Sequence, residues 1–263
     1  MSRAFRTIRV GVENGVATIT LNRPERKNPL GNEMVNELCW ALDDAKEAAD
    51  VRVVVLTGAG EAFSAGGDLK AMSSGPDAEG REALAQRGDY VDLLLRFGAL
   101  GKPTIARVRG VAMGGGLGLV AACDFAIAGE SAVLGTPEIK RGLFPMMIMA
   151  VLRRVVSKRR LMEMMLLGEK MDARTAAEIE LVSRAVPDAK LDEEVAALAG
   201  KLAAQSPTAM RLGLAAWNAQ SDRDLASSLP MLRDQLGAVL MTEDAREGLM
   251  AFAEKREPKW TGR

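Results

Sequence analysis

One stretch of the chain constrains its fold more than any other. An apolar, strand-like run ending at Met113 leads directly into Gly114, Gly115 and Gly116, and an apolar helix-like segment follows. Three consecutive glycines leave their backbone N–H groups uncovered at what reads as a helix N-terminus, where a developing negative charge is stabilised. This segment predicts a strand–loop–helix unit whose loop can hold an oxyanion.

A second glycine loop of the same character lies earlier in the chain. Residues 63–69, F-S-A-G-G-D-L, come soon after the β-rich run at 52–57, and one backbone donor from each loop would complete an oxyanion hole. Losing one such donor typically costs about 3–4 kcal/mol in the reaction barrier. The alternative is that these glycines only permit tight turns. The presence of both loops in one chain favours the oxyanion role.

The composition excludes several kinds of chemistry. The chain has 263 residues and no histidine, which rules out Ser-His-Asp and Cys-His catalysis as well as histidine-based zinc and haem sites. Its two cysteines, Cys39 and Cys123, are too few to replace them, and they show no pairing pattern. Acid–base work therefore falls to carboxylates, lysines, thiols or Tyr90.

Charge and hydropathy limit the partners and the location. The 35 basic residues balance 35 acidic ones, so no broad surface for nucleic acid or membrane is expected. The N-terminus lacks the apolar core of a signal peptide, and no apolar run is long enough to cross a bilayer. We expect a cytoplasmic protein with reduced thiols.

The order of predicted elements indicates an α/β core followed by a helical portion. A hairpin is expected at 8–20 around the turn Asn14-Gly15, and Asp172 and Ser221 are candidate helix N-caps. The other predicted strands are 52–57, 104–111, 122–128 and 132–135. The predicted helices are 31–49, 82–100, 153–167, 173–179, 191–205, 208–220 with Pro207 in its first turn, 222–241 and 243–255.

Several short motifs occur along the chain in a specific order. They are Leu21-Asn22-Arg23-Pro24, the loop A-F-S-A-G-G-D-L, the triple glycine, Pro137-Glu138-Ile139, and a tail that runs from Arg246-Glu247-Gly248 to Phe252-Ala253-Glu254-Lys255-Arg256. In this combination the chain resembles the crotonase superfamily, the enoyl-CoA hydratase/isomerase family, over nearly its whole length.

The resemblance implies an α/β fold: a spiral of ββα units over residues 1–200, then a C-terminal helical subdomain over residues 201–263. It also implies a homotrimer or a dimer of trimers. The substrate would be an acyl-CoA thioester, with no separate cofactor and no metal.

The resemblance also implies roles for particular residues. Gly67 and Gly115 would donate their amides to the thioester oxygen, and Glu138 would be the general acid and base. Asp68 has a structural alternative to a role in the site, since an aspartate at such a position more commonly caps a helix, here one that begins at Leu69. Clustered methionines such as Met146 more commonly pack in the core. The positions that would contact CoA or the acyl chain are Lys27, Ala65, Gly66, Asp68, Leu69, Gly114, Met146, Phe252 and Lys255.

The chain departs from the family pattern at two positions. Hydratases of this family carry a second glutamate where this chain has Gly118, and hydration there uses two carboxylates to hold and split one water. A single base suffices to move a double bond. The missing second glutamate therefore favours an enoyl-CoA isomerase, and hydration stays open as an alternative. Met146 stands at or near the position where dienoyl-CoA isomerases and aryl-CoA dehalogenases place an aspartate. A specialised reaction of the superfamily and a non-catalytic acyl-CoA-binding protein remain as alternatives.

Overall fold

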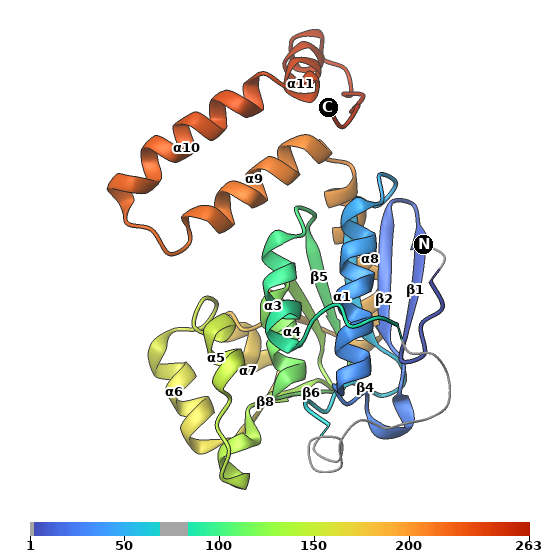
Figure 1. The fold of residues 1–263 in the computed structure, drawn as a ribbon, viewed down its shortest axis with the longest axis vertical. Helices are drawn as coiled ribbons and strands as arrows, with labels where there is room; N and C mark the ends of the chain where they lie inside the picture. The colour runs from blue at the N-terminus through green and yellow to red at the C-terminus, as the bar shows by residue number, and fades with distance from the viewer. Residues whose placement is uncertain (1–2, 69–83) are drawn as a thin grey trace.

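The computed structural model describes residues 3–68 and 84–263. Strands and helices alternate through the first part of the chain, and helices make up its last part (Figure 1). The strands are β1 (Ile8–Glu13), β2 (Val16–Leu21), β3 (Val53–Gly58), β4 (Ala62–Ser64), β5 (Thr104–Val108), β6 (Val111–Met113), β7 (Phe125–Gly129), β8 (Val133–Gly135), β9 (Lys170–Asp172) and β10 (Arg184–Val186).

The helices follow the predicted order. The α-helices are α1 (Asn32–Glu47), α3 (Tyr90–Ala99), α4 (Gly115–Ala122), α5 (Met146–Leu152), α6 (Lys158–Leu167), α7 (Ala173–Glu178), α8 (Leu191–Ala203), α9 (Pro207–Gln220), α10 (Leu225–Leu240) and α11 (Glu243–Glu254). Short 3₁₀ helices are η1 (Pro24–Arg26), η2 (Pro137–Arg141) and η3 (Asp188–Lys190).

The predicted N-terminal hairpin is confirmed. β1 and β2 pair antiparallel, and the two turn residues Asn14 and Gly15 have φ of 50° and 79°. Positive φ at both central residues is what a type I′ hairpin turn requires, and asparagine followed by glycine adopts it readily.

The larger sheet has six strands in the order β1-β2-β3-β5-β7-β10, with parallel pairing from β2 onward. Side chains alternate between its faces. Val53 and Val55 pack with Ile105 and Ile127 in the cluster that includes residues of α8, whereas Leu56 packs in the main core with α1. Because both faces are covered, β3 is an almost continuous apolar run.

The smaller sheet gives the fold its repeated unit. Its order is β4-β6-β8-β9, and β4, β6 and β8 come directly after β3, β5 and β7 of the larger sheet. Each consecutive pair of strands therefore places one strand in each sheet, and α4 follows β6 as the helix of its unit. This is the α/β arrangement of ββα units that the resemblance implies, and the C-terminal helices follow it (Figure 1).

One predicted strand is divided in the structure, and one predicted helix begins later than expected. The predicted strand 104–111 forms β5 and β6, because the chain turns at Gly110 with φ of 59°, where a side chain would collide with the carbonyl oxygen of Glu61. The predicted helix 153–167 was wrong in its start: a short α5 begins after Pro145, and α6 begins after Ser157, whose backbone is extended.

Two helix starts also differ from the prediction. The helix expected from residue 82 begins at Tyr90, because the carboxylate of Asp89 accepts hydrogen bonds from the first amides of α3. Ser221 is not an N-cap; Asp224 caps α10 instead, by accepting a hydrogen bond from the amide of Ser227. The predicted cap at Asp172 is confirmed by its bond from the amide of Thr175.

The helices α9, α10 and α11 form an extension at one end of the molecule (Figure 1). Within it, α9 packs on α3 as well as on α10 and α11. In the part of the chain that the structure describes, no helix has the length and hydropathy that crossing a bilayer would need.

Candidate active site

The first glycine loop presents an amide that is free to bind a ligand. The amide of Leu30 donates to the carbonyl of Gly66 at 2.8 Å, and the amide of Asp68 donates to the carbonyl of Leu30 at 3.1 Å. In this parallel pairing the backbone groups of Gly67 face away from Leu30. Within the described residues the Gly67 amide has no acceptor, and Gly67 is exposed.

Two buried polar residues hold this loop in place. The Asn28 side chain donates to the carbonyls of Ala59 at 3.0 Å and Ala62 at 2.8 Å. The hydroxyl of Ser64 donates to the carbonyl of Asn28 at 2.7 Å and accepts from the amide of Gly66 at 3.1 Å. Sequence reasoning missed both residues, since nothing in their local pattern shows that they are buried.

The second loop brings another amide beside the first. Helix α4 begins at Gly115, so the Gly115 amide is one of the first four that have no partner inside the helix. A Cβ atom on Gly66 would lie 3.5 Å from this nitrogen and 2.7 Å from the carbonyl oxygen of Met113. With φ of 93°, position 66 accepts only glycine without strain, and the two loops are in contact there.

Glu138 lies against the second loop. It sits in η2, which starts at Pro137 and is followed by Gly142 in the left-handed conformation. A Cβ atom on Gly114 would be 2.7 Å from the Oε1 atom of Glu138, so the carboxylate packs directly on the backbone of the triple glycine. The predicted acid/base residue and the predicted oxyanion loop therefore lie side by side.

The environment of Glu138 suits proton transfer. Its Oε2 atom is buried and has no hydrogen-bond partner among the described residues. Burial raises the pKa of Glu138, and its backbone and the positive charge of Arg141 oppose this rise without cancelling it. A carboxylate with a raised pKa and an open lone pair is prepared to take a proton from a bound substrate.

Part of the predicted CoA-binding set gathers next to the first loop. The amide of Ala65 donates to the carbonyl of Lys27 at 2.8 Å, which brings these two residues together. Asp68 is buried and forms an ion pair with Arg26 at 3.0 Å. Leu69, and with it the predicted helix that Asp68 would cap, lies outside the described residues.

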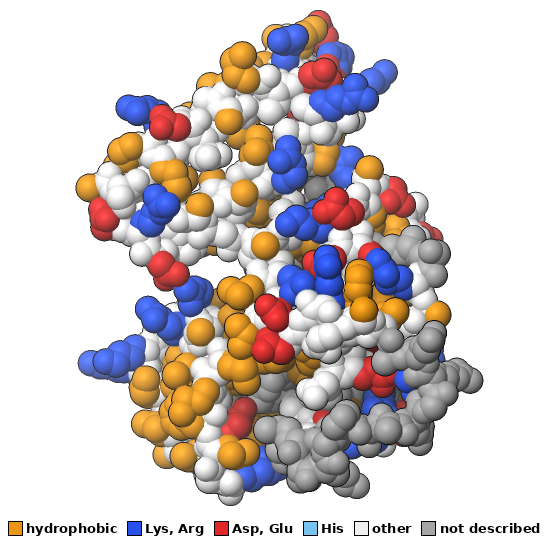
Figure 2. Space-filling view, viewed as in Figure 1, with side chains coloured by type: hydrophobic (Ala, Val, Ile, Leu, Met, Phe, Trp, Pro, Cys, Tyr) orange, Lys and Arg blue, Asp and Glu red, His pale blue; other side chains and the backbone are white. Residues whose placement is uncertain are grey.

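Other members of that set lie on the surface of the single chain. Met146 is the first residue of α5 and is 63% exposed. Figure 2 shows hydrophobic side chains gathered over α5 and α6. Phe252 is 86% exposed and Lys255 ends α11. Figure 1 places α11 at the end of the molecule remote from α5, so one chain does not bring these two residues to Glu138.

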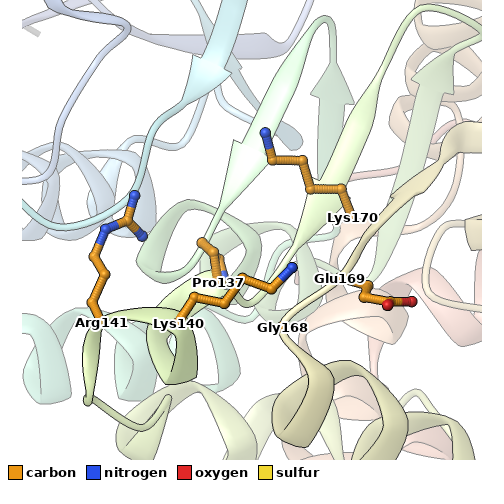
Figure 3. Close-up of a pocket in the computed structure, with 6 residues that line it drawn as sticks. All are labelled: Pro137, Lys140, Arg141, Gly168, Glu169 and Lys170. Carbon is orange, nitrogen blue, oxygen red and sulfur yellow. The ribbon is translucent and has the colours of Figure 1, made fainter.

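A cavity of about 580 Å³ lies between η2 and residues 168–170. Figure 3 shows its lining, in which the cations of Lys140, Arg141 and Lys170 surround the opening and Glu169 lies at its edge. Neither the two amide donors nor Glu138 lines it. The cavity is therefore distinct from the place where the two loops meet Glu138, although Pro137 and Arg141 border both.

Comparison with known proteins defines the family. The model of the enoyl-CoA hydratase/isomerase family matches residues 11–263. The probable enoyl-CoA hydratase echA8 of Mycobacterium bovis is 36% identical over 260 residues, which cover 98% of this chain and 99% of the relative. The chain belongs to the enoyl-CoA hydratase/isomerase family, the crotonase superfamily.

Solved structures agree with this assignment. The enoyl-CoA hydratase of Mycobacterium smegmatis matches with a TM-score of 0.89 and 36% identity, covering 97% of this chain and 99% of that one. The enoyl-CoA hydratase of Bacillus anthracis also matches with a TM-score of 0.89 and 36% identity, over 98% of this chain and 100% of that one. The fold predicted from the sequence is therefore shown.

Proposed function

We propose that the chain transforms an acyl-CoA thioester through an enolate held by the amides of Gly67 and Gly115, with Glu138 moving the proton. The observation that carries this proposal is the meeting of two amides without acceptors and one desolvated carboxylate at the contact between the loops. Negative charge that develops on the thioester oxygen would be stabilised there, close to the base. Proton transfer at carbon needs no redox partner, so the thioester alone would be the ligand.

The reaction that this geometry supports best is a shift of the double bond between the 3-enoyl and 2-enoyl thioesters. Glu138 would remove a proton from C2 of the 3-enoyl chain, the electrons of the C3=C4 bond would join the dienolate, and the same proton would return at C4. One carboxylate is enough for this cycle. Position 118, where a second carboxylate would stand, is a glycine.

Hydration of the 2-enoyl thioester is the second candidate. The relatives from Mycobacterium smegmatis and Bacillus anthracis carry the name enoyl-CoA hydratase, and their folds match this chain closely. Hydration would require Glu138 to take the proton from water and return one to C2 without a second carboxylate.

We further propose that CoA is held by the groups around the first loop and, in an assembly of three or six copies, by α11 of a neighbour. Lys27, Ala65 and Gly67 lie on adjacent segments, whereas Phe252 and Lys255 are exposed at the far end of the chain. Their separation within one copy supports a site completed by a second copy.

The test is incubation of the protein with paired 2-enoyl-CoA and 3-enoyl-CoA substrates, with products separated by chromatography and identified by mass. Interconversion without a change of mass is expected, and Glu138→Gln should slow it by at least about 100-fold while CoA-ester binding persists. Glu169→Gln, which removes a carboxylate outside the site, is the matched control and should retain the rate.

The other outcomes separate the alternatives. Addition of one water in a Glu138-dependent reaction would make hydration the function. Tight CoA-ester binding without any product would contradict the catalytic proposal and indicate a binding protein.

A further inference from the structure

Position 118 faces the same part of the site as the oxyanion donor. Gly115 and Gly118 are three residues apart in α4, so they lie on one face of the helix about one turn apart. A side chain at position 118 would therefore project beside the thioester group that the Gly115 amide holds.

That space is already filled. A Cβ atom on Gly118 would lie 2.5 Å from the hydroxyl oxygen of Tyr90 and would also collide with Ile148. Helices α3 and α5, which carry these two side chains, pack against α4 from different directions (Figure 1). Even an alanine would force its neighbours to move, so a second carboxylate has no room while Tyr90 and Ile148 keep these positions.

Tyr90 is firmly held in this position. Its hydroxyl donates to the carbonyl of Gly115 at 2.6 Å. It is the first residue of α3, where the Asp89 side chain accepts from the amides of Val91 at 2.8 Å and Asp92 at 3.0 Å. The segment before it is tied to α1, because the side chain of Asn36 donates to the carbonyl of Ala85 at 3.1 Å.

The phenol of Tyr90 cannot replace a carboxylate as an acid or a base. Burial raises the pKa of Tyr90, and the negative charge of Glu138 adds to the rise, so the phenol stays protonated over the whole working range. Its single proton is engaged by the Gly115 carbonyl. Tyr90 therefore supplies neither a base nor a free proton beside Glu138.

We propose that Tyr90 is the specificity-determining residue of this active site: it occupies the place of a second acid/base group and of the water that such a group would hold. The site is thereby committed to a one-base reaction. This inference rests on the proposed function, since it concerns which product the Glu138-dependent reaction forms.

The experiment measures the ratio of hydrated to isomerised product in the full-length protein and its variants. Tyr90→Ala opens the space and should raise this ratio at least tenfold, because water can then approach the enoyl group opposite Glu138. Tyr90→Phe keeps the ring and should leave the ratio close to that of the parent protein. Phe97→Ala, an aromatic truncation on the same helix, is the matched control for a general loosening of α3.

Several results would overturn the inference. One is a Tyr90→Ala ratio within twofold of the parent protein, and another is an equal change in Phe97→Ala. A parent protein that hydrates as fast as it isomerises would also contradict it.

A second measurement keeps the inference testable if the parent protein forms neither product. Tyr90 is the only tyrosine of the chain, so protein labelled with ¹³Cζ-tyrosine gives a single resonance. A bound, unreactive thioether analogue of crotonyl-CoA should shift that resonance. A resonance that does not move when the analogue binds would place Tyr90 away from the ligand and overturn the inference independently of catalysis.

Discussion

At the scale of single residues, the candidate site depends on the incomplete hydrogen bonding of the Glu138 carboxylate. One of its oxygens is buried without a partner, which costs on the order of 1 kcal/mol or more in stability. The nearby guanidinium of Arg141 recovers part of this cost by favouring the charged form. Such a carboxylate is more easily protonated than a fully paired one, which suits the role of base that we propose for it.

Arg141→Gln should move the acidic limb of the activity profile to higher pH. Burial already raises the pKa of Glu138, and removing the charge that opposes this rise should raise it further. Because the base must be ionised, activity falls as the pH drops through that pKa, so the fall should begin at a higher pH in the variant. The measurement is kcat/KM as a function of pH.

Lys140→Gln is the control for this prediction, since it removes a neighbouring cation from the same short helix. A profile that moves equally in both variants would mean that net charge, and not Arg141, sets the pKa of Glu138.

At the scale of single elements, the start of α3 positions Tyr90. The capping box of Asp89 and Asp92 fixes the first turn, and residues 84–89, the described residues directly before it, have no helical structure. The helix predicted from residue 82 crosses this boundary, whereas α3 begins at Tyr90. The start of α3 is set by the Asp89 carboxylate, which accepts hydrogen bonds from the amides of Val91 and Asp92.

Asp89→Ala should lower the stability by about 1 kcal/mol and the melting temperature by a few degrees, since it removes a helix cap. It should also loosen Tyr90 and raise the ratio of hydrated to isomerised product. Thermal unfolding and the product assay measure the two effects.

Asp224→Ala provides the comparison for Asp89→Ala, because Asp224 caps α10 through the amide of Ser227 at 3.0 Å. It should lower the stability by a similar amount without changing the products. If both variants change the product ratio equally, the cap of α3 has no special relation to the site.

At the scale of the whole molecule, the C-terminal tail is fastened to the start of α11 and to α9 through one buried carboxylate. Asp244 accepts from the hydroxyl of Ser206 at 2.8 Å and from the amides of Thr261 at 2.7 Å and Gly262 at 3.0 Å. This cluster joins the last residues of the chain to the junction between α8 and α9.

Asp244→Asn should destabilise the protein at neutral pH by roughly 1–3 kcal/mol, because an amide cannot accept all of these bonds. Burial by itself would raise the pKa of Asp244, but the hydrogen bonds from Ser206, Thr261 and Gly262 outweigh it and lower the pKa. Because the pKa of Asp244 is lowered in the folded state, its carboxylate contributes to the free energy of unfolding at pH values above the unfolded pKa of about 4. This contribution is lost as the pH falls through the pKa of the folded state.

Thermal unfolding between pH 7 and pH 3 measures this contribution. The difference between the parent protein and Asp244→Asn should narrow toward the acidic end. Asp192→Asn, which changes a largely exposed aspartate with one ion pair, should have little effect at any pH. A difference that stays constant with pH would show that Asp244 does not act through its charge.

Local sequence patterns were sufficient to predict the structure wherever adjacent residues determine the backbone conformation or form a motif. Asn14-Gly15 determines a hairpin turn, Val53 to Leu56 forms a buried strand, and the triple glycine opens α4. These elements follow from local conformational preference or from a pattern of neighbouring residues. The choice of Gly67, Gly115 and Glu138 as site residues came from the resemblance to the family, through the position of each residue in its motif.

Only the tertiary structure decided how distant segments share space. It divides the run 104–111 at Gly110, because the backbone of Glu61 leaves no room for a side chain there. It brings Tyr90 and Ile148 into the place that Gly118 leaves empty, and it seats Asn28 beneath the first loop. Close packing and the pairing of buried polar groups join residues far apart in the chain, and such contacts leave no trace in local sequence.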